Sequence, residues 1–187
     1  MTLSVETQDE IKAMVRGGFE EHDRIVEIFC EEMYAPGELD PQEVETAVAA
    51  AIRELEAEKA SWPKITDCDR LDAVFEALNK QGIVAIQNAG YTQSDGYSDV
   101  MEMHGDSDDP KSNIGYCFFH QQDLERAVAG SGLFLAFGPI DPEKEETDGA
   151  TIGRIIVDLL KGAGFSVDWP GTFDKRIAIT VIDWKRR

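Results

Sequence analysis

The sequence predicts an α+β protein in which helices cover a mixed, largely antiparallel sheet of four or five strands, with a helical appendage at the N-terminal side. Up to residue 62, apolar residues recur at i, i+3 and i+4, a spacing typical of amphipathic helices. From residue 66 onward, short runs of branched and aromatic residues alternate with helical patterns. We therefore expect a helical region, residues 1–62, and an α+β domain, residues 66–187.

The N-terminal region contains three helical patterns. Thr7 and Glu10 have the spacing of a capping box at the start of the first, and the glycine pair 17–18 separates it from the second. The third has a strong start signal, because Asp40 can cap the helix and Pro41 fixes φ at its first position. Its apolar line is narrow, so we expect it to pack on the sheet domain. That line consists of Val44, Val48, Ala51 and Leu55, followed by Trp62.

The α+β domain opens with a helix whose start pattern is Thr66 followed by Asp69 and which ends at Gly82. Strand patterns follow at residues 83–87, 115–119, 133–137, 165–169 and 176–184. Helical patterns between them lie near residues 93–103, 121–129 and 150–161. A proline-glycine turn, residues 170–174, joins the last two strands and is too short for a crossover helix, so these strands should be antiparallel.

The composition is strongly acidic, with 37 Asp and Glu residues against 18 Lys and Arg and a formal charge of −19. The excess is even: residues 1–66 carry 6 basic and 16 acidic groups, and residues 67–187 carry 12 and 21. Such a charge opposes direct contact with nucleic acid or an anionic membrane, and no apolar run is long enough to span a bilayer. Two explanations stay open, solubility or a salty habitat on one side and recognition of a basic protein partner on the other. A homodimer is compatible with either.

The cysteines indicate a cytoplasmic protein in a reducing compartment. Cys30, Cys68 and Cys117 are odd in number and widely separated, so they form neither a disulfide framework nor a zinc-binding spacing. The first residues lack the features of a secretory or organellar leader. We predict no metal and no cofactor.

A polar loop after the first strand pattern is the first candidate ligand site. Asn88, Tyr91, Thr92 and Asp95 would supply hydrogen-bond donors, acceptors and a stacking ring. The alternative is structural, because Thr92 has the position of a helix N-cap and Asp95 would complete its capping box.

Two histidines are further candidates. His104 opens an acidic stretch that looks like a metal loop but fits no established template, and a solvated loop is the alternative. His120 follows a strand pattern and would act either as a base or as the neighbour of a helix N-cap. Cys117 precedes it by three residues, so in an extended strand the two side chains point to opposite faces and do not form a nucleophile pair.

Trp169 is the last candidate site residue. It ends a strand pattern before Pro170 and Gly171, which reverse the chain. The indole would pack in the core, near Leu160 and Phe165, or line the rim of a site.

Three segments, residues 83–92, 115–128 and 167–177, resemble an uncharacterised bacterial family, a domain of unknown function. This resemblance covers most of residues 66–187 and implies no activity. Residues 164–171 also resemble, in fold and charge alone, the inhibitor B of ribonuclease E, an acidic α+β regulator.

Two hypotheses of function follow. The first is a non-enzymatic binding or regulatory module that recognises a protein partner, because a charge of −19 accompanies no catalytic motif. The second is a small enzyme or ligand-binding protein with a cleft bordered by Asn88, Tyr91, His104 and His120.

Overall fold

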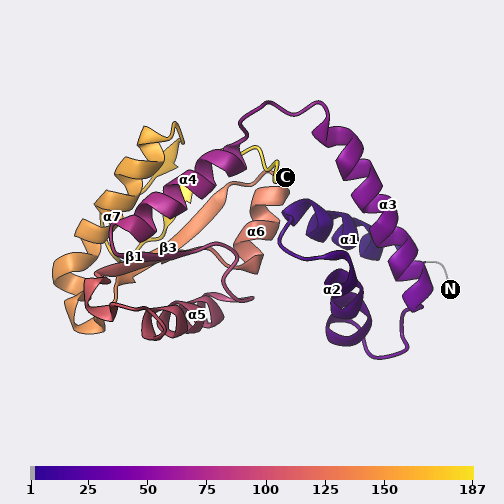
Figure 1. Ribbon diagram of the computed structural model, residues 1–187, viewed down its shortest axis with the longest axis horizontal. Helices are drawn as coiled ribbons and strands as arrows, with labels where there is room; N and C mark the ends of the chain where they lie inside the picture. Colours follow the sequence, from indigo (N-terminus) through magenta and orange to yellow (C-terminus); the bar gives the residue numbers. More distant parts are fainter. Residues whose placement is uncertain (1–2) are drawn as a thin grey trace. The chain divides into compact units, whose positions relative to one another are not determined.

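The computed structural model describes residues 3–187 (Figure 1). The chain divides into two compact units. Unit 1 extends to Thr66 and is completed by Trp184–Arg187, and unit 2 is Asp67–Asp183. Unit 1 is helical and unit 2 combines helices with a five-stranded sheet, so the α+β class is confirmed.

Unit 1 contains α1 (Val5–Gly17), α2 (His22–Glu27) with a π-helical continuation (Ile28–Met33), and α3 (Pro41–Lys59). The predicted capping residue of α1 is wrong, because Ser4 is the N-cap and its hydroxyl accepts a hydrogen bond from the Thr7 backbone N–H. The start of α3 is confirmed: the Asp40 side chain accepts a hydrogen bond from the backbone N–H of Gln42, and Pro41 is the first helical residue.

The apolar line of α3 lies in the core of unit 1 itself. Val44 and Val48 are fully buried and pack with Ile11, Ile25 and Phe29 of the two preceding helices. The expectation that this line packs on the sheet domain is therefore wrong. Its side chains, which include Ala51, Leu55 and Trp62, have a hydrophobic core of their own.

A segment distant in sequence completes unit 1. The Trp184 indole is buried, lies 6.4 Å from the Phe19 ring and donates a hydrogen bond through Nε1 to the Gly17 carbonyl at 3.2 Å. The guanidinium of Arg186 stacks 4.2 Å from the centre of the Phe19 ring. A cation over an aromatic face is attracted by the ring quadrupole, so both contacts hold this segment on the helices.

The sheet of unit 2 has the order β1-β2-β3-β5-β4. Its strands are β1 (Ile83–Ile86), β2 (Gly115–Phe118), β3 (Leu133–Pro139), β4 (Val167–Asp168) and β5 (Ile177–Ile179). β1 and β2 are parallel, and the other pairs are antiparallel, as predicted for β4 and β5. The prediction of a strand over 176–184 is too long. β5 stops at Ile179 because its partner there, Leu133, is the first residue of β3.

Helices cover both faces of the sheet (Figure 1). α4 (Asp67–Lys80) and α7 (Glu145–Gly162) pack on one face, and α5 (Gln93–Gly105) and α6 (Gln121–Val128) on the other. Successive side chains of a strand point to opposite faces of the sheet, so they contribute in turn to the core on one face and to the core on the other. Phe119 meets Phe75 of α4 edge to face at 5.9 Å, whereas Phe118 packs with Val100 of α5.

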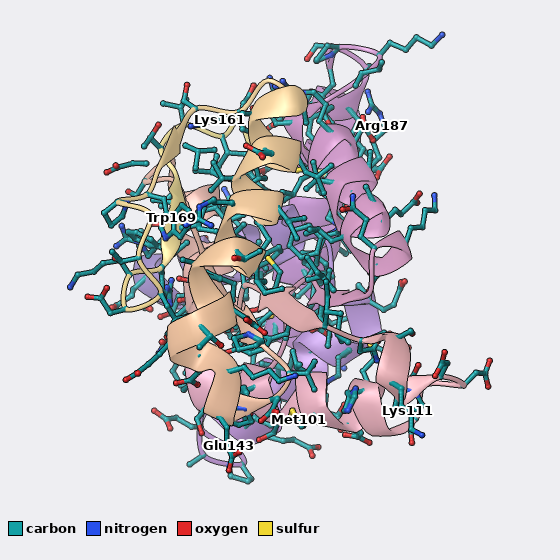
Figure 2. The ribbon with its side chains drawn as sticks, turned by 90° about the vertical axis from the view of Figure 1, so that its left-hand side faces the viewer. Met101, Lys111, Glu143, Lys161, Trp169 and Arg187 are labelled. Carbon is teal, nitrogen blue, oxygen red and sulfur yellow. The ribbon has the colours of Figure 1, made fainter. Side chains whose placement is uncertain are left out.

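Trp169 lies beside α7, at a level between Glu143, just before the helix, and Lys161 in its last turn (Figure 2). Its indole meets the Phe137 ring at 5.7 Å and occupies the space above Gly153, where a Cβ atom would lie 2.5 Å from the ring. Its Nε1 donates to the carbonyls of Thr172 and Lys175 at 3.0 and 3.1 Å. The ring thus joins the β4–β5 turn to the helix.

Candidate functional site

The carboxyl ends of the parallel strands β1 and β2 carry two loops that lie side by side. The Ala89 N–H donates to the Phe119 carbonyl at 2.9 Å, and the Gln121 N–H donates to the Gly90 carbonyl at 3.0 Å. α5 and α6 begin directly after these loops. In open sheets, ligands bind in the crevice at the carboxyl ends of the strands, so this edge is the natural place for a site.

An open groove of about 700 Å³ lies at this edge. The start of α5, the first two turns of α6, β3 and the segment before β5 contribute its lining. The lining residues are Gln93, His120, Gln122, Asp123, Arg126, Phe134, Asp174, Lys175 and Arg176.

A buried ion network forms one wall of the groove. The Asp123 carboxylate, 2% exposed, pairs with the Arg176 guanidinium through Oδ1 and lies 3.0 Å from His120 Nε2 through Oδ2. Oδ2 also faces the backbone N–H of His120 at 3.4 Å. A buried carboxylate is stable only when it is paired and hydrogen-bonded, and these contacts supply both conditions.

The His120 ring is neutral in this network. Burial is the largest influence and lowers its pKa below the ordinary value, and the nearby Arg176 lowers it further, whereas Asp123 and Asp95 act in the opposite direction. Nε2 lies 3.0 Å from the Asp123 carboxylate, which can only accept a hydrogen bond, and 3.2 Å from Nη1 of Arg176, which can only donate one. Nδ1 is buried without a hydrogen-bond partner among the described residues.

The rest of the groove is more basic than the chain as a whole. The guanidinium groups of Arg126 and Arg176 lie 5.0 and 5.1 Å from the centre of the Phe134 ring. Arg126 is exposed and, within residues 3–187, has no ion pair. Lys175 is exposed and only loosely paired with Asp174 at 3.8 Å. Three strong bases therefore face two acids in a protein of charge −19.

The candidate residues of the polar loop differ in role and in exposure. Thr92 and Asp95 form the capping box of α5, in which the Asp95 carboxylate accepts a hydrogen bond from the Thr92 N–H at 2.9 Å. Hydrogen bonds from Thr92 lower the pKa of Asp95. Asn88 has a left-handed backbone, φ 53°, and its Oδ1 is buried with no hydrogen-bond partner in the described part of the chain. Tyr91 is 58% exposed.

The other candidates are not brought together. His104 lies in the last turn of α5, away from the start of that helix, with its Nδ1 3.1 Å from the side-chain nitrogen of Asn113. Trp169 packs on α7, which covers the opposite face of the sheet from α6. Of the six predicted residues, only His120 lines the groove.

Two further features limit the chemistry of the described residues. Burial raises the pKa of the Cys117 thiol strongly, so it carries no thiolate near neutral pH. Within residues 3–187, no three His, Cys, Asp or Glu side chains are grouped so as to hold a metal ion. In the same range, no helix has the length and apolar character needed to cross a membrane.

Sequence reasoning missed most of the groove. Asp123 is recoverable in part, since it follows His120 by three residues at the start of a predicted helix, the spacing of a capping box. Arg176 lies 53 residues after Asp123 in sequence, and Phe134 belongs to a strand between them. No local pattern indicates that these side chains meet.

A family model for a domain of unknown function, DUF6891, matches residues 2–187. The chain belongs to this family. The match extends the resemblance seen in residues 66–187 to the helical region as well, so both units are part of the family's domain. No curated protein and no solved structure gave a match. The likeness to the inhibitor B of ribonuclease E is therefore not confirmed.

Proposed function

We propose that this member of the DUF6891 family is a non-enzymatic binding module that recognises a protein partner through the groove beside α6. The observation that carries the proposal is the groove itself. It is open and lined mainly by polar and charged residues, and its wall is fixed by the buried network of His120, Asp123 and Arg176. A recognition surface needs such rigid side chains, because less conformational entropy is then lost on binding.

The state of His120 favours binding over catalysis. A general base must present a nitrogen to its substrate at hydrogen-bond distance. Nε2 of His120 faces Asp123 and Arg176, and Nδ1 is buried, so the ring has no free nitrogen at the groove surface. Cys117 faces the opposite side of the sheet, where α4 and α7 pack, and offers no nucleophile to the groove.

The shape and composition of the groove favour a protein partner over a small molecule. Small-molecule sites usually enclose most of the ligand surface, whereas this groove is open along its length. Arginine and aromatic side chains, phenylalanine included, are enriched at protein interfaces. Arg126 and Phe134 provide that combination within one contact of 5.0 Å.

Affinity capture from a native lysate, with a variant that blocks the groove, tests the proposal. Gln122→Trp places a large ring on an exposed lining position without touching the ion network, and Gln81→Trp, in the turn after α4, is the matched control. We expect the wild-type protein and the control to retain the same partner and Gln122→Trp to lose it. Capture of the same proteins by all three would contradict a role for the groove.

The second candidate is a ligand-binding protein or small enzyme, with its site at the adjoining loops of Asn88, Tyr91 and His120 and without His104, which lies at the other end of α5. One observation favours it: the buried Oδ1 of Asn88 has no partner among the described residues, and its loop adjoins that of His120. A rise of the melting temperature with metals or nucleotides would support this candidate, and an unchanged melting temperature would count against it. The predicted basic partner of the acidic surface stays a separate prediction.

A further inference from the structure

We infer that the groove binds a carboxylate group of an acidic segment of the partner, through Arg126 and Lys175. The inference rests on the proposed function and names the chemistry that the groove recognises.

The local charge is the first argument. Acidic groups outnumber basic ones by 37 to 18 in the chain, whereas in the groove three bases face two acids. Some exposed bases, such as Arg16 and Arg24 of unit 1, are paired with glutamates, and others, such as Arg154, have no ion pair within residues 3–187. Arg126 is not paired within the described residues, although it is exposed on the same acidic protein. An unneutralised guanidinium in such a setting is available for an anionic group from outside.

The orientation of Arg126 is the second argument. Its guanidinium lies over the Phe134 ring, which limits the rotamers of the side chain and leaves the N–H groups at the edge of the guanidinium plane for hydrogen bonding. A planar guanidinium fork matches the two oxygens of a carboxylate. Ordering before binding reduces the entropy lost when the ligand arrives.

The backbone at the starts of α5 and α6 adds a positive potential to that of the basic side chains. Gln93 is the first residue of α5, and Gln122 and Asp123 belong to the first turn of α6. The starts of both helices therefore border the groove, and helix N-termini favour negative charge. The charge of Asp123 does not oppose the ligand strongly, because Arg176 neutralises it.

A carboxylate fits the groove better than a phosphate. Arg126, Lys175 and Arg176 exceed Asp123 and Asp174 by a single positive charge. One negative charge balances that excess, whereas a phosphate near neutral pH carries more than one and meets a protein of charge −19. Phe134 also gives the groove an apolar wall, which suits the methylene groups of a glutamate side chain.

Titration of the full-length protein with a tetraglutamate peptide, followed by backbone amide NMR shifts, tests the inference. We expect Arg126→Gln to weaken binding about tenfold, since a charge-assisted hydrogen bond is lost. The matched control is Arg154→Gln, which removes the same charge from an exposed position on α7 and should change affinity less than about twofold. Lys175→Gln provides a second groove variant with the same expected direction. Binding should also weaken between about 50 and about 300 mM salt.

Two further probes define the outcomes. Equal binding of a tetraglutamine peptide, or tighter binding of inorganic phosphate, would overturn the assignment of a carboxylate. Equal effects of Arg126→Gln and Arg154→Gln would overturn the assignment of the groove. If tetraglutamate fails to bind while Gln122→Trp still loses the captured partner, the carboxylate inference fails and the proposed function stands. If Gln122→Trp loses nothing, the proposed function itself fails.

Discussion

The two units place their charges differently. In unit 1 the ion pairs lie on the surface, as in Arg16 with Glu58 at 2.7 Å and Lys12 with Glu54 at 3.4 Å, above a core of aliphatic and aromatic side chains. In unit 2 the network of His120, Asp123 and Arg176 is drawn into the protein beside the groove, and two of its three side chains are at least 95% buried.

This difference separates charges that keep a protein soluble from charges that shape a site. Exposed ion pairs contribute little to stability, about 0 to 1 kcal/mol, so those of unit 1 can be exchanged at small cost. A buried pair offsets a large desolvation penalty, and breaking it leaves an uncompensated charge. We therefore expect substitutions in the network of unit 2 to affect both stability and binding, and those of the surface pairs to affect neither much.

The largest expected effect comes from removal of the C-terminal segment Trp184–Arg187, which belongs to unit 1 and not to unit 2. A chain that ends after Asp183 loses the buried Trp184 ring and its hydrogen bond to Gly17. Unit 1 should be destabilised by at least about 3 to 5 kcal/mol, the range for removal of a buried tryptophan. Hydrogen exchange should show faster exchange in α1 to α3 and unchanged protection in β1 to β3.

Trp184→Phe is the control for this truncation. It keeps a ring near Phe19 and removes the Nε1 hydrogen bond, so the loss should be smaller, about 1 to 2 kcal/mol. Unchanged protection in α1 to α3 after truncation would show that the helices are stable without Trp184.

Trp169→Ala is the corresponding change in unit 2. The ring packs on Gly153 and Phe137 but is partly exposed, so we expect a loss of about 3 kcal/mol. Thermal unfolding measures the loss, and hydrogen exchange should locate it in α7 and β3. A variant that melts like the wild type while losing a partner would instead assign Trp169 to a binding surface.

Gly153→Ala tests the same contact from the helix side. Its new Cβ would lie 2.5 Å from the Trp169 ring and 2.8 Å from the Phe137 ring, so overpacking should destabilise unit 2 by about 1 to 3 kcal/mol. In the Trp169→Ala background the same substitution should cost less, because the Trp169 ring is gone and only the close approach to Phe137 remains. Additive losses in the double variant would show that the helix and the turn do not share this contact.

The smallest expected effect is a change in pH dependence. The pKa of His120 is lowered in the folded protein, so near its ordinary value of about 6.5 the unfolded chain binds more protons than the folded one. The contribution of His120 to the free energy of unfolding should therefore be complete above about pH 6.5. It should decrease as the pH drops towards the pKa of the folded state. His120→Gln removes this contribution, and urea unfolding between about pH 5 and 8 should show a flatter slope. An equal slope in both proteins would place the pH dependence elsewhere.

Features set by neighbouring residues were predictable from the sequence. The start of α3 at Asp40 and Pro41 and the capping box of Thr92 and Asp95 depend on residues within one helical turn. The end of β5 was not, because it depends on where β3 begins and not on the apolar pattern that continues to Trp184. A strand ends where its partner ends, and a single sequence does not contain that register.

The groove shows the same limit more strongly. His120 was identified as a residue at the end of a strand and the start of a helix, which is its position. Its partner Arg176 directly precedes β5 and the Phe134 ring belongs to β3, so their meeting depends on the order of the strands in the sheet. The interpretation of Asn88, Tyr91, His104 and His120 as one cleft assumed proximity that α5 does not give to His104, twelve residues beyond Thr92.

The discontinuity of unit 1 also implies an order of events during synthesis. Domains generally fold as they leave the ribosome, beginning with the N-terminal one. Here α1 to α3 emerge early, but Trp184 follows only after residues 67–183 have been made. Until then the Gly17 carbonyl lacks the hydrogen bond from Trp184, and the Phe19 ring lacks its contact with the Trp184 indole. Unit 1 is therefore made before unit 2 but completed after it. While unit 2 is being translated, the apolar surface that Trp184 covers stays exposed on the helices of unit 1.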